Sequence, residues 1–335
     1  MKRLSFVIPF LNEAANLPVL YERLKAVAPR LGCAAEYLFV NDGSRDASES
    51  IVRGWARSDP AVVLVNLSRN FGHQTAVFAG LQHASGDAVV ILDADLQDRP
   101  EAVESFIARW EAGADVVYAV REKRKENILK RLLFSAFYRL LFRLASIPIP
   151  LEAGLFCLMD RKVVDVIAAM PERNRFVPGM RAWAGFRQEG VPVERDPRTD
   201  GPPRVRFHRL VGLALDAVFS FSTIPLRLAT AVGLFSAFVA AVATGVVFYF
   251  RFFTTQAIPG WTSTLLSIFF FGSVQLISIG IIGEYLGRIY EEVKQRPAYV
   301  VREVVRGTAG DTAPDGGDAR GAVGAGALPK PGERA

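Results

Sequence analysis

The segment "VVILDADLQD", residues 89–98, decides how the first part of this chain folds. Its first four residues are apolar, as expected for a strand buried on both faces of a parallel sheet. Three aspartates and a glutamine follow at once: Asp93, Asp95, Gln97 and Asp98. Side chains at positions i and i+2 of an extended segment point the same way, so Asp93 and Asp95 converge. The strand therefore carries a cluster of carboxylates at its end.

This cluster fits a metal site or a simple turn. Two carboxylates held close together repel each other unless a cation lies between them. Hard divalent ions such as Mg²⁺ and Mn²⁺ favour such oxygen ligands, and substrate phosphates commonly complete their coordination. The alternative is a strand that ends in a solvated acidic turn, because Asp favours turns in general. The rest of the sequence has to decide between them.

Strand-like and helix-like segments alternate along the first 120 residues. The strand patterns lie at residues 4–10, 37–42, 62–68, 88–95 and 115–120. This alternation predicts an α/β fold with right-handed crossovers and a mostly parallel sheet. Ligands of such sheets bind beyond the carboxyl ends of the strands. Polar residues fall at that edge: Asn12, Glu13, Asn41, Asp42, Gly43 and the cluster at 93–98.

Two long uncharged stretches follow in the second half of the chain. Residues 228–250 contain no charge, and neither do residues 262–283, within a span that we place at 262–286. Each exceeds the roughly 20 residues that cross a bilayer core of about 30 Å as a helix. The alternative is a pair of buried core helices in a soluble protein. We predict two transmembrane helices, which also explain why half of all residues are hydrophobic.

The charges around these stretches predict their orientation. The intervening loop has a single base, Arg251, whereas the outer flanks carry many. The positive-inside rule then places both termini in the cytoplasm, with the protein in a bacterial plasma membrane. The opening "MKRLSFVIPFL" has too short an apolar run for an export signal, and Asn12 and Glu13 end it. Two isolated cysteines, Cys33 and Cys157, fit a reducing compartment.

The domain organisation follows from these patterns. We expect a cytoplasmic α/β domain at 1–205, which includes a basic helix at 125–145. An amphipathic interfacial helix at 206–227 precedes the first span. A cytoplasmic juxtamembrane segment at 287–306 follows the second span. The Gly/Ala/Pro-rich tail at 307–335 has little to bury and is expected to be disordered.

Four segments, in this order and spacing, identify a family resemblance: "VIPFLNEAANLP", "VNDGSRDAS", "NLSRNFGHQTAVFAGLQHASGD" and "ILDADLQDRPE". Together they resemble the family 2 glycosyltransferases with a GT-A fold. The branch that transfers sugars to polyprenyl phosphates is the most similar, and it includes dolichol-phosphate mannose synthases and undecaprenyl-phosphate glycosyltransferases. The resemblance covers about residues 4–296. It implies a nucleotide-sugar donor, a polyprenyl phosphate acceptor and a divalent Mg²⁺ or Mn²⁺ ion.

The resemblance also implies roles for particular residues. Asp93 and Asp95 would place the metal on the donor diphosphate, where it neutralises the leaving group. Asp42 would contact the nucleobase and Glu13 the ribose, although Asp42 could instead form a simple Asx-turn. The expected donor-binding set is Pro9, Asn12, Glu13, Asp42, Asn70, Gly72 and Asp93. The expected catalytic set is Asp93, Asp95, Gln97, Asp98, Glu152 and Arg121.

Arginines between the carboxylate cluster and the spans are candidates for phosphate binding. A guanidinium group can bind two phosphate oxygens at once, which suits the donor diphosphate and the lipid phosphate. Arg121 is expected at the catalytic centre, and the expected acceptor-phosphate ligands are Arg124, Arg175, Arg198 and Arg204. The alternative for each is a solvated basic face against anionic lipid.

The sequence departs from the family pattern on the acceptor side. "LEAGLFCLMD" keeps a carboxylate at Glu152, but Leu155 replaces a second acid, and Arg204 stands where a lysine is usual. His73, His83 and His208 are isolated and are expected to be structural or interfacial. The chain has no Cys/His cluster for zinc and no phosphate loop of the Gly-Lys-Ser/Thr type.

These observations predict a membrane-anchored, metal-dependent, inverting glycosyltransferase. Its expected donor is UDP-glucose or a related UDP-sugar, and its expected acceptor is undecaprenyl phosphate at the cytoplasmic leaflet. One rival is transfer to another lipid such as diacylglycerol, and a second is a catalytically weakened membrane scaffold. We expect the lipid bilayer as a partner and no nucleic acid. The sequence leaves open whether the protein forms a homo-oligomer.

Overall fold

The computed structural model describes residues 2–121, 153–172, 175–194, 224–253 and 260–307. The predicted basic helix at 125–145, most of the predicted interfacial helix and the predicted tail from residue 308 lie outside these residues.

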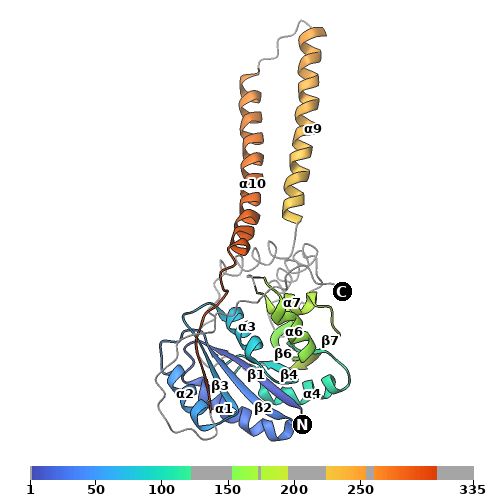
Figure 1. Ribbon diagram of the computed structural model, residues 1–335. Helices are drawn as coiled ribbons and strands as arrows, with labels where there is room; N and C mark the ends of the chain where they lie inside the picture. The colour runs from blue at the N-terminus through green and yellow to red at the C-terminus, as the bar shows by residue number, and fades with distance from the viewer. Residues whose placement is uncertain (1, 122–152, 173–174, 195–223, 254–259, 308–335) are drawn as a thin grey trace, which may run out of the picture.

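A single sheet organises the described part of the α/β domain (Figure 1). Its eight strands lie in the order β7-β5-β6-β4-β1-β2-β3-β8. They are β1 (Arg3–Phe10), β2 (Ala34–Asn41), β3 (Val62–Leu67), β4 (Ala88–Ile91), β5 (Val116–Arg121), β6 (Ala153–Asp160), β7 (Gln188–Val193) and β8 (Val301–Arg306). The central strands β4, β1, β2 and β3 are all parallel, and β5 pairs parallel with β7. The prediction of a mostly parallel α/β sheet is confirmed.

Helices cover both faces of the sheet. On one face lie α1 (Asn16–Val27), α2 (Ser48–Ser58) and α4 (Val103–Glu111), and on the other α3 (His73–His83), α6 (Arg161–Ala169) and α7 (Val177–Trp183). Short 3₁₀ turns occupy Ala28–Leu31 and Pro100–Ala102. Side chains of β1 alternate between the two cores: Phe6 and Ile8 pack on the α1 side, and Val7 packs on the α3 side. This alternation explains why the strands read as continuous apolar runs.

Close packing fixes α3 on the sheet. A Cβ atom at Gly80 would lie only 2.3 Å from Cγ1 of Val7, so only glycine allows this approach. The N-terminus of α3 is thereby held at the carboxyl edge of the sheet. The loops that follow β1, β2, β3 and β4 meet at the same edge, because these strands run parallel.

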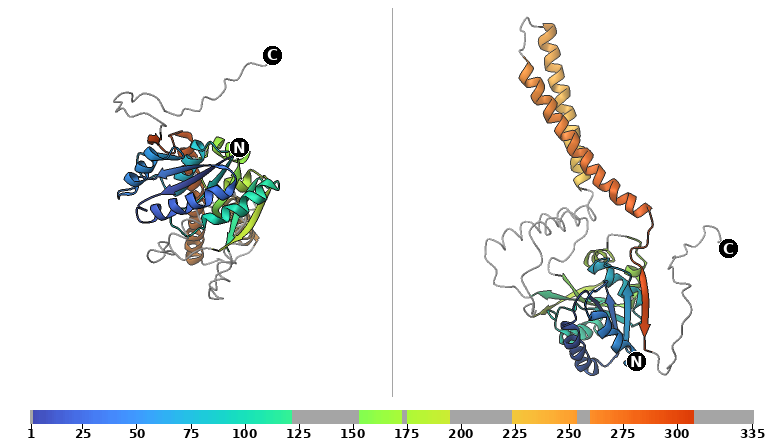
Figure 2. Two further views of the ribbon diagram at one scale, coloured as in Figure 1. Left: turned by 90° about the horizontal axis from the view of Figure 1, so that it is seen from below. Right: turned by 90° about the vertical axis from the view of Figure 1, so that its left-hand side faces the viewer.

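Two long helices extend away from this domain, side by side in both views (Figures 1 and 2). They are α9 (Ile224–Phe253) and α10 (Trp261–Val293), and they contain the predicted spans at 228–250 and 262–286. Within them, Leu226–Val246 and Ser267–Val293 are long and apolar enough to cross a membrane. At most 11% of either stretch is buried in the structure. Both helices are therefore candidate membrane spans.

The chain returns to the sheet after α10, which the sequence analysis did not predict. Residues 301–306, assigned there to a juxtamembrane segment, form β8 and pair antiparallel with β3 at the sheet edge. Figure 2 shows this strand beside the domain and below α10. Partly buried and exposed side chains alternate along "VREVVR", and Arg302 and Arg306 are on the exposed side. This is the period-2 pattern of a charged edge strand.

Candidate active site

The carboxylates of the opening segment lie directly after β4 at the carboxyl edge of the sheet. The amide of Gln97 donates a hydrogen bond to Oδ1 of Asp95 at 3.1 Å, and Leu96 between them has a positive φ of 59°. Asp95 therefore closes a tight turn through one oxygen of its carboxylate. Asp98 is buried, and together with Asp93 it lines a small cavity of about 50 Å³.

His73 is part of this site, although its sequence context suggested a structural or interfacial residue. Its Nε2 lies 2.9 Å from Oδ1 of Asp93, and 48% of its side chain is exposed. Partial desolvation lowers the pKa of His73. The hydrogen bond and charge of Asp93, with the charges of Asp42 and Asp95, outweigh that effect and raise the pKa above its usual value. The first residue of α3 is thus coupled to an expected metal ligand.

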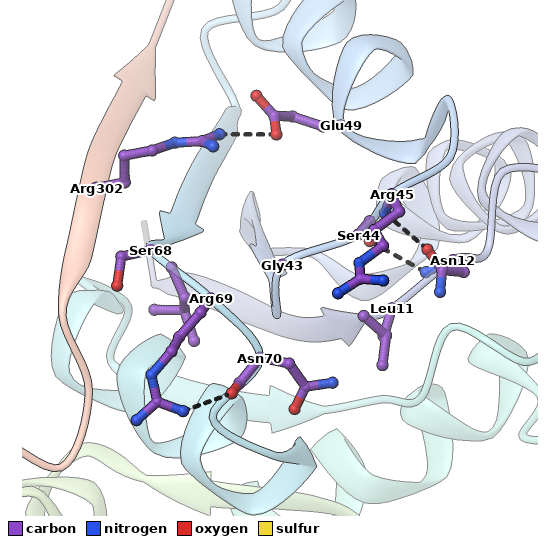
Figure 3. Close-up of a pocket in the computed structure, with 11 residues that line it drawn as sticks. Leu11, Asn12, Gly43, Ser44, Arg45, Glu49, Ser68, Arg69, Asn70 and Arg302 are labelled. Atoms are coloured by element: carbon purple, nitrogen blue, oxygen red, sulfur yellow. Dashed lines mark hydrogen bonds and ion pairs between the residues drawn. The ribbon is translucent and has the colours of Figure 1, made fainter.

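A larger cavity of about 480 Å³ opens over the ends of β1, β2 and β3, at the same edge of the sheet (Figure 3). Its lining residues are Leu11, Asn12, Gly43, Ser44, Arg45, Glu49, Leu67, Ser68, Arg69, Asn70 and Arg302. The lining contains three arginines and one glutamate, so the cavity carries a net positive charge and favours an anionic ligand. The expected donor-binding residues Asn12 and Asn70 line it, so we refer to it below as the donor pocket.

Contacts between loops shape the floor of the donor pocket. The amide of Arg45 donates to Oδ1 of Asn12 at 2.8 Å, and the amide of Asn12 donates to Oγ of Ser44 at 3.0 Å. A Cβ atom at Gly43 would lie 2.7 Å from the backbone of Arg69 and Asn70. The loops after β1, β2 and β3 therefore hold one another in place.

Asp42 has a structural role besides the contact with the nucleobase that the resemblance implies. Only 3% of it is exposed, and its two oxygens accept hydrogen bonds from the amides of Phe71 at 2.7 Å and Gly72 at 3.0 Å. Burial raises the pKa of Asp42, and these hydrogen bonds oppose that shift only in part. The contacts join two different loops, so they are not the simple Asx-turn considered above. Each oxygen can still accept a second hydrogen bond, because a carboxylate oxygen has two lone pairs.

The other expected donor residues lie at the same edge. Pro9 is buried near the end of β1. The amide of Glu13 donates to Oγ of Ser48, and its carboxylate accepts from Asn16 at 2.6 Å. Gly72 precedes α3 with a φ of 98°, a conformation that glycine adopts without strain.

The expected phosphate-binding arginines are only partly described. Arg175 lies with its guanidinium carbon 3.4 Å from the ring centre of Phe78 and 6.0 Å from that of Tyr299. Its Nε also donates to the carbonyl of Glu172 at 3.1 Å. Arg175 thus packs between α3 and the segment that joins α10 to β8. Arg121 ends β5, opposite Val193.

The side chain of Arg121 lies outside the described residues, and so do four expected residues of the acceptor side. They are Arg124, Glu152, Arg198 and Arg204.

The contribution of β8 to this edge of the sheet was not predicted from the sequence. Arg302 lines the donor pocket and its Nη2 donates to Oε2 of Glu49 at 2.7 Å. The next residue, Glu303, pairs with Arg53 and accepts a hydrogen bond from the buried side chain of Asn66 at 3.0 Å. The three charged residues of "VREVVR" could have indicated an edge strand, but not the strand with which it pairs.

Comparison with known proteins gives a consistent result. A profile of glycosyl transferase family 2 matches residues 5–167. "Uncharacterized glycosyltransferase YkcC" of Bacillus subtilis is 42% identical over 300 residues, which cover 89% of this chain and 93% of that protein. The "SfII prophage-derived bactoprenol glucosyl transferase" of Shigella flexneri is also 42% identical, over 91% of this chain and 99% of its own length.

Among solved structures, the mannosyltransferase PcManGT of Pyrobaculum calidifontis aligns with a TM-score of 0.43 at 19% identity. The alignment covers 85% of this chain and 87% of that one. This likeness is too low to bear on the activity.

Proposed function

Because this chain belongs to glycosyltransferase family 2, we propose that it transfers a sugar from a nucleotide sugar to a polyprenyl phosphate. The donor is UDP-glucose or a related UDP-sugar, and the acceptor is undecaprenyl phosphate or a similar lipid. The observation that carries the proposal is the placement of Asp93 and Asp95 after β4, at the same carboxyl edge of the sheet as the donor pocket. The bactoprenol glucosyl transferases among the relatives support the choice of acceptor.

Asp93 and Asp95 suit a divalent Mg²⁺ or Mn²⁺ ion, because both offer hard carboxylate oxygens. Within the part of the chain that the structure describes, no group of three His, Cys, Asp or Glu side chains forms a ready-made metal site. Two protein carboxylates therefore fit an ion that takes its remaining ligands from a diphosphate and water. When bound, the ion supplies Lewis-acid neutralisation of the leaving diphosphate.

His73 would orient Asp93 for that task. Its imidazole contacts one oxygen of Asp93, and hydrogen bonds to ligating groups commonly fix their orientation. The buried Asp98 lies next to the same small cavity. Gly80 fixes the position of α3 on β1, and His73 at the start of α3 would then hold the carboxylate of Asp93 in place.

The transfer itself breaks the bond between the anomeric carbon and the diphosphate oxygen, whose electron pair leaves with the nucleoside diphosphate. An oxygen of the lipid phosphate forms the new bond from the opposite face, so the anomeric configuration inverts. A phosphate monoester is largely dianionic near neutral pH, since its second pKa is about 6. The acceptor therefore needs orientation more than deprotonation. This is the role proposed for Glu152, Arg124, Arg175, Arg198 and Arg204, with Arg121 at the catalytic centre.

Membrane attachment would bring the acceptor to this site. We propose that the candidate spans in α9 and α10 attach the domain to the cytoplasmic leaflet of a bacterial plasma membrane, with both termini in the cytoplasm. An undecaprenyl chain stays in the bilayer while its phosphate reaches the domain.

A panel of radiolabelled nucleotide sugars tests the proposal. The full-length protein in bilayers that contain undecaprenyl phosphate should move label from one UDP-sugar into extractable lipid, and Asp95→Asn should abolish this transfer. Label that enters diacylglycerol in preference to undecaprenyl phosphate would support the rival acceptor. Nucleotide binding without transfer to any lipid would indicate a scaffold.

A further inference from the structure

We propose that Arg302 of β8 is a specificity-determining residue of the donor pocket. Its guanidinium donates a hydrogen bond to the 4-carbonyl oxygen of the donor's uracil base, and so distinguishes uracil from cytosine. This inference rests on the proposed function, because it requires a nucleotide sugar in the donor pocket.

The position of Arg302 carries the first part of the argument. It lines the donor pocket from the strand that follows both candidate membrane spans, and its side chain is 49% exposed (Figure 3). Glu49 holds the guanidinium in place through the 2.7 Å hydrogen bond. A guanidinium group has five N–H donors, so this bond leaves donors for a ligand in the pocket.

Strand order decides which part of the nucleotide Arg302 would meet. The carboxylates that suit the diphosphate follow β4, whereas β8 lies four strands further along the sheet, or about 19 Å. A nucleotide with its diphosphate at Asp93 and Asp95 extends over β1, β2 and β3 along the donor pocket. Its base then lies at the end of the pocket that Arg302 borders.

The chemistry of a guanidinium decides between the bases. An arginine side chain donates hydrogen bonds and accepts none. At position 4, uracil presents a carbonyl oxygen, as thymine does, whereas cytosine presents an amino group that only donates. Arg302 therefore favours uracil and opposes cytosine, which has almost the same shape.

The test compares UDP and CDP binding to the full-length protein in nanodiscs with Mn²⁺, by isothermal titration calorimetry. Arg302→Ala should weaken UDP binding about 10-fold, the loss expected for one charge-assisted hydrogen bond in a half-exposed site, and leave CDP binding almost unchanged. Arg302→Met keeps the aliphatic part of the side chain packed on the strand and should give the same loss. Arg306→Ala is the matched control. Arg306 is an arginine on the same strand and face, and it pairs with Val63 at the other end of β3.

Unchanged UDP binding in Arg302→Ala and Arg302→Met would overturn the inference, and so would an equal loss for UDP and CDP. Either result leaves the proposed function intact if the wild-type protein still transfers sugar from a UDP-sugar. A wild-type protein that binds neither nucleotide would instead refute the proposed function.

Discussion

Replacing Glu303 by alanine should detach β8 from the sheet while the rest of the domain stays folded. The carboxylate of Glu303 pairs with Arg53 and accepts the hydrogen bond from Nδ2 of Asn66. Asn66 is fully buried, and its own Oδ1 accepts from Asn41 at 2.9 Å. Glu303→Ala removes the ion pair and leaves a buried amide donor without this acceptor.

Two contributions set the magnitude. The ion pair with Arg53 is partly exposed, at 25% for Arg53 and 37% for Glu303, so screening limits it to about 0.5 kcal/mol. Leaving the buried donor of Asn66 unsatisfied costs about 1–3 kcal/mol. A total of about 2 kcal/mol corresponds to roughly a 30-fold increase in the open population of β8.

Hydrogen exchange measured by mass spectrometry reads this opening directly. Amides of residues 301–306 should exchange roughly 30-fold faster in Glu303→Ala, whereas those of β1 should keep their wild-type rates. Arg302→Ala serves as the control, because it breaks only partly exposed ion pairs, with Glu49 and Glu303, and leaves Asn66 paired. Wild-type exchange of β8 in Glu303→Ala would show that this polar network does not hold the strand. Equally fast exchange in β1 would show that β8 does not open independently.

Two further predictions concern the metal ligands and pH. His73→Ala should weaken Mn²⁺ binding in the presence of UDP several-fold, measured by electron paramagnetic resonance, because Asp93 loses its orienting hydrogen bond; unchanged Mn²⁺ affinity would make His73 a bystander. Burial raises the pKa of Glu49, but hydrogen bonds and charges of Arg53 and Arg302 outweigh it and lower that pKa. The pKa of Glu303 is also lowered, chiefly by Arg53. The ionised forms of both glutamates therefore stabilise β8 at pH values above the unfolded pKa near 4.3. That stability should be lost as pH falls through the lowered folded pKa values of the two glutamates. Hydrogen-exchange protection of β8, corrected for intrinsic rates, should therefore be constant from pH 7 to 5.5 and should decrease at pH values below about 4. A loss already between pH 7 and 6 would point to another titrating group.

Local sequence pattern was sufficient for the central sheet. The apolar runs before Asn12, Asp42 and Asp93 are each a strand followed by a polar loop, and parallel strands bring such loops to one edge. The candidate spans were also predictable, since a helix that crosses a bilayer needs a long uncharged stretch.

Contacts between distant segments were not predictable from the same patterns. Arg302 and Glu49 are 253 positions apart, and no periodicity in either segment indicates the other. His73 begins an apolar helix, and only the packing of α3 on β1 brings it to Asp93. Arg175 was expected at the acceptor phosphate, but an arginine in sequence gives no sign that it will stack on Phe78. Its role in acceptor binding stays a prediction.

The role proposed for Asp93 and Asp95 is to support sugar transfer to a lipid phosphate. The most direct test is mass spectrometry of the lipid formed when the full-length protein, in bilayers with Mn²⁺, receives UDP-glucose and undecaprenyl phosphate. The expected product is undecaprenyl phosphate with one added hexose and its single phosphate retained, formed in step with UDP release. It should be absent with EDTA and with Asp95→Asn. Full product formation by Asp95→Asn in chelator, or hexose found only on a lipid without phosphate, would contradict the claim.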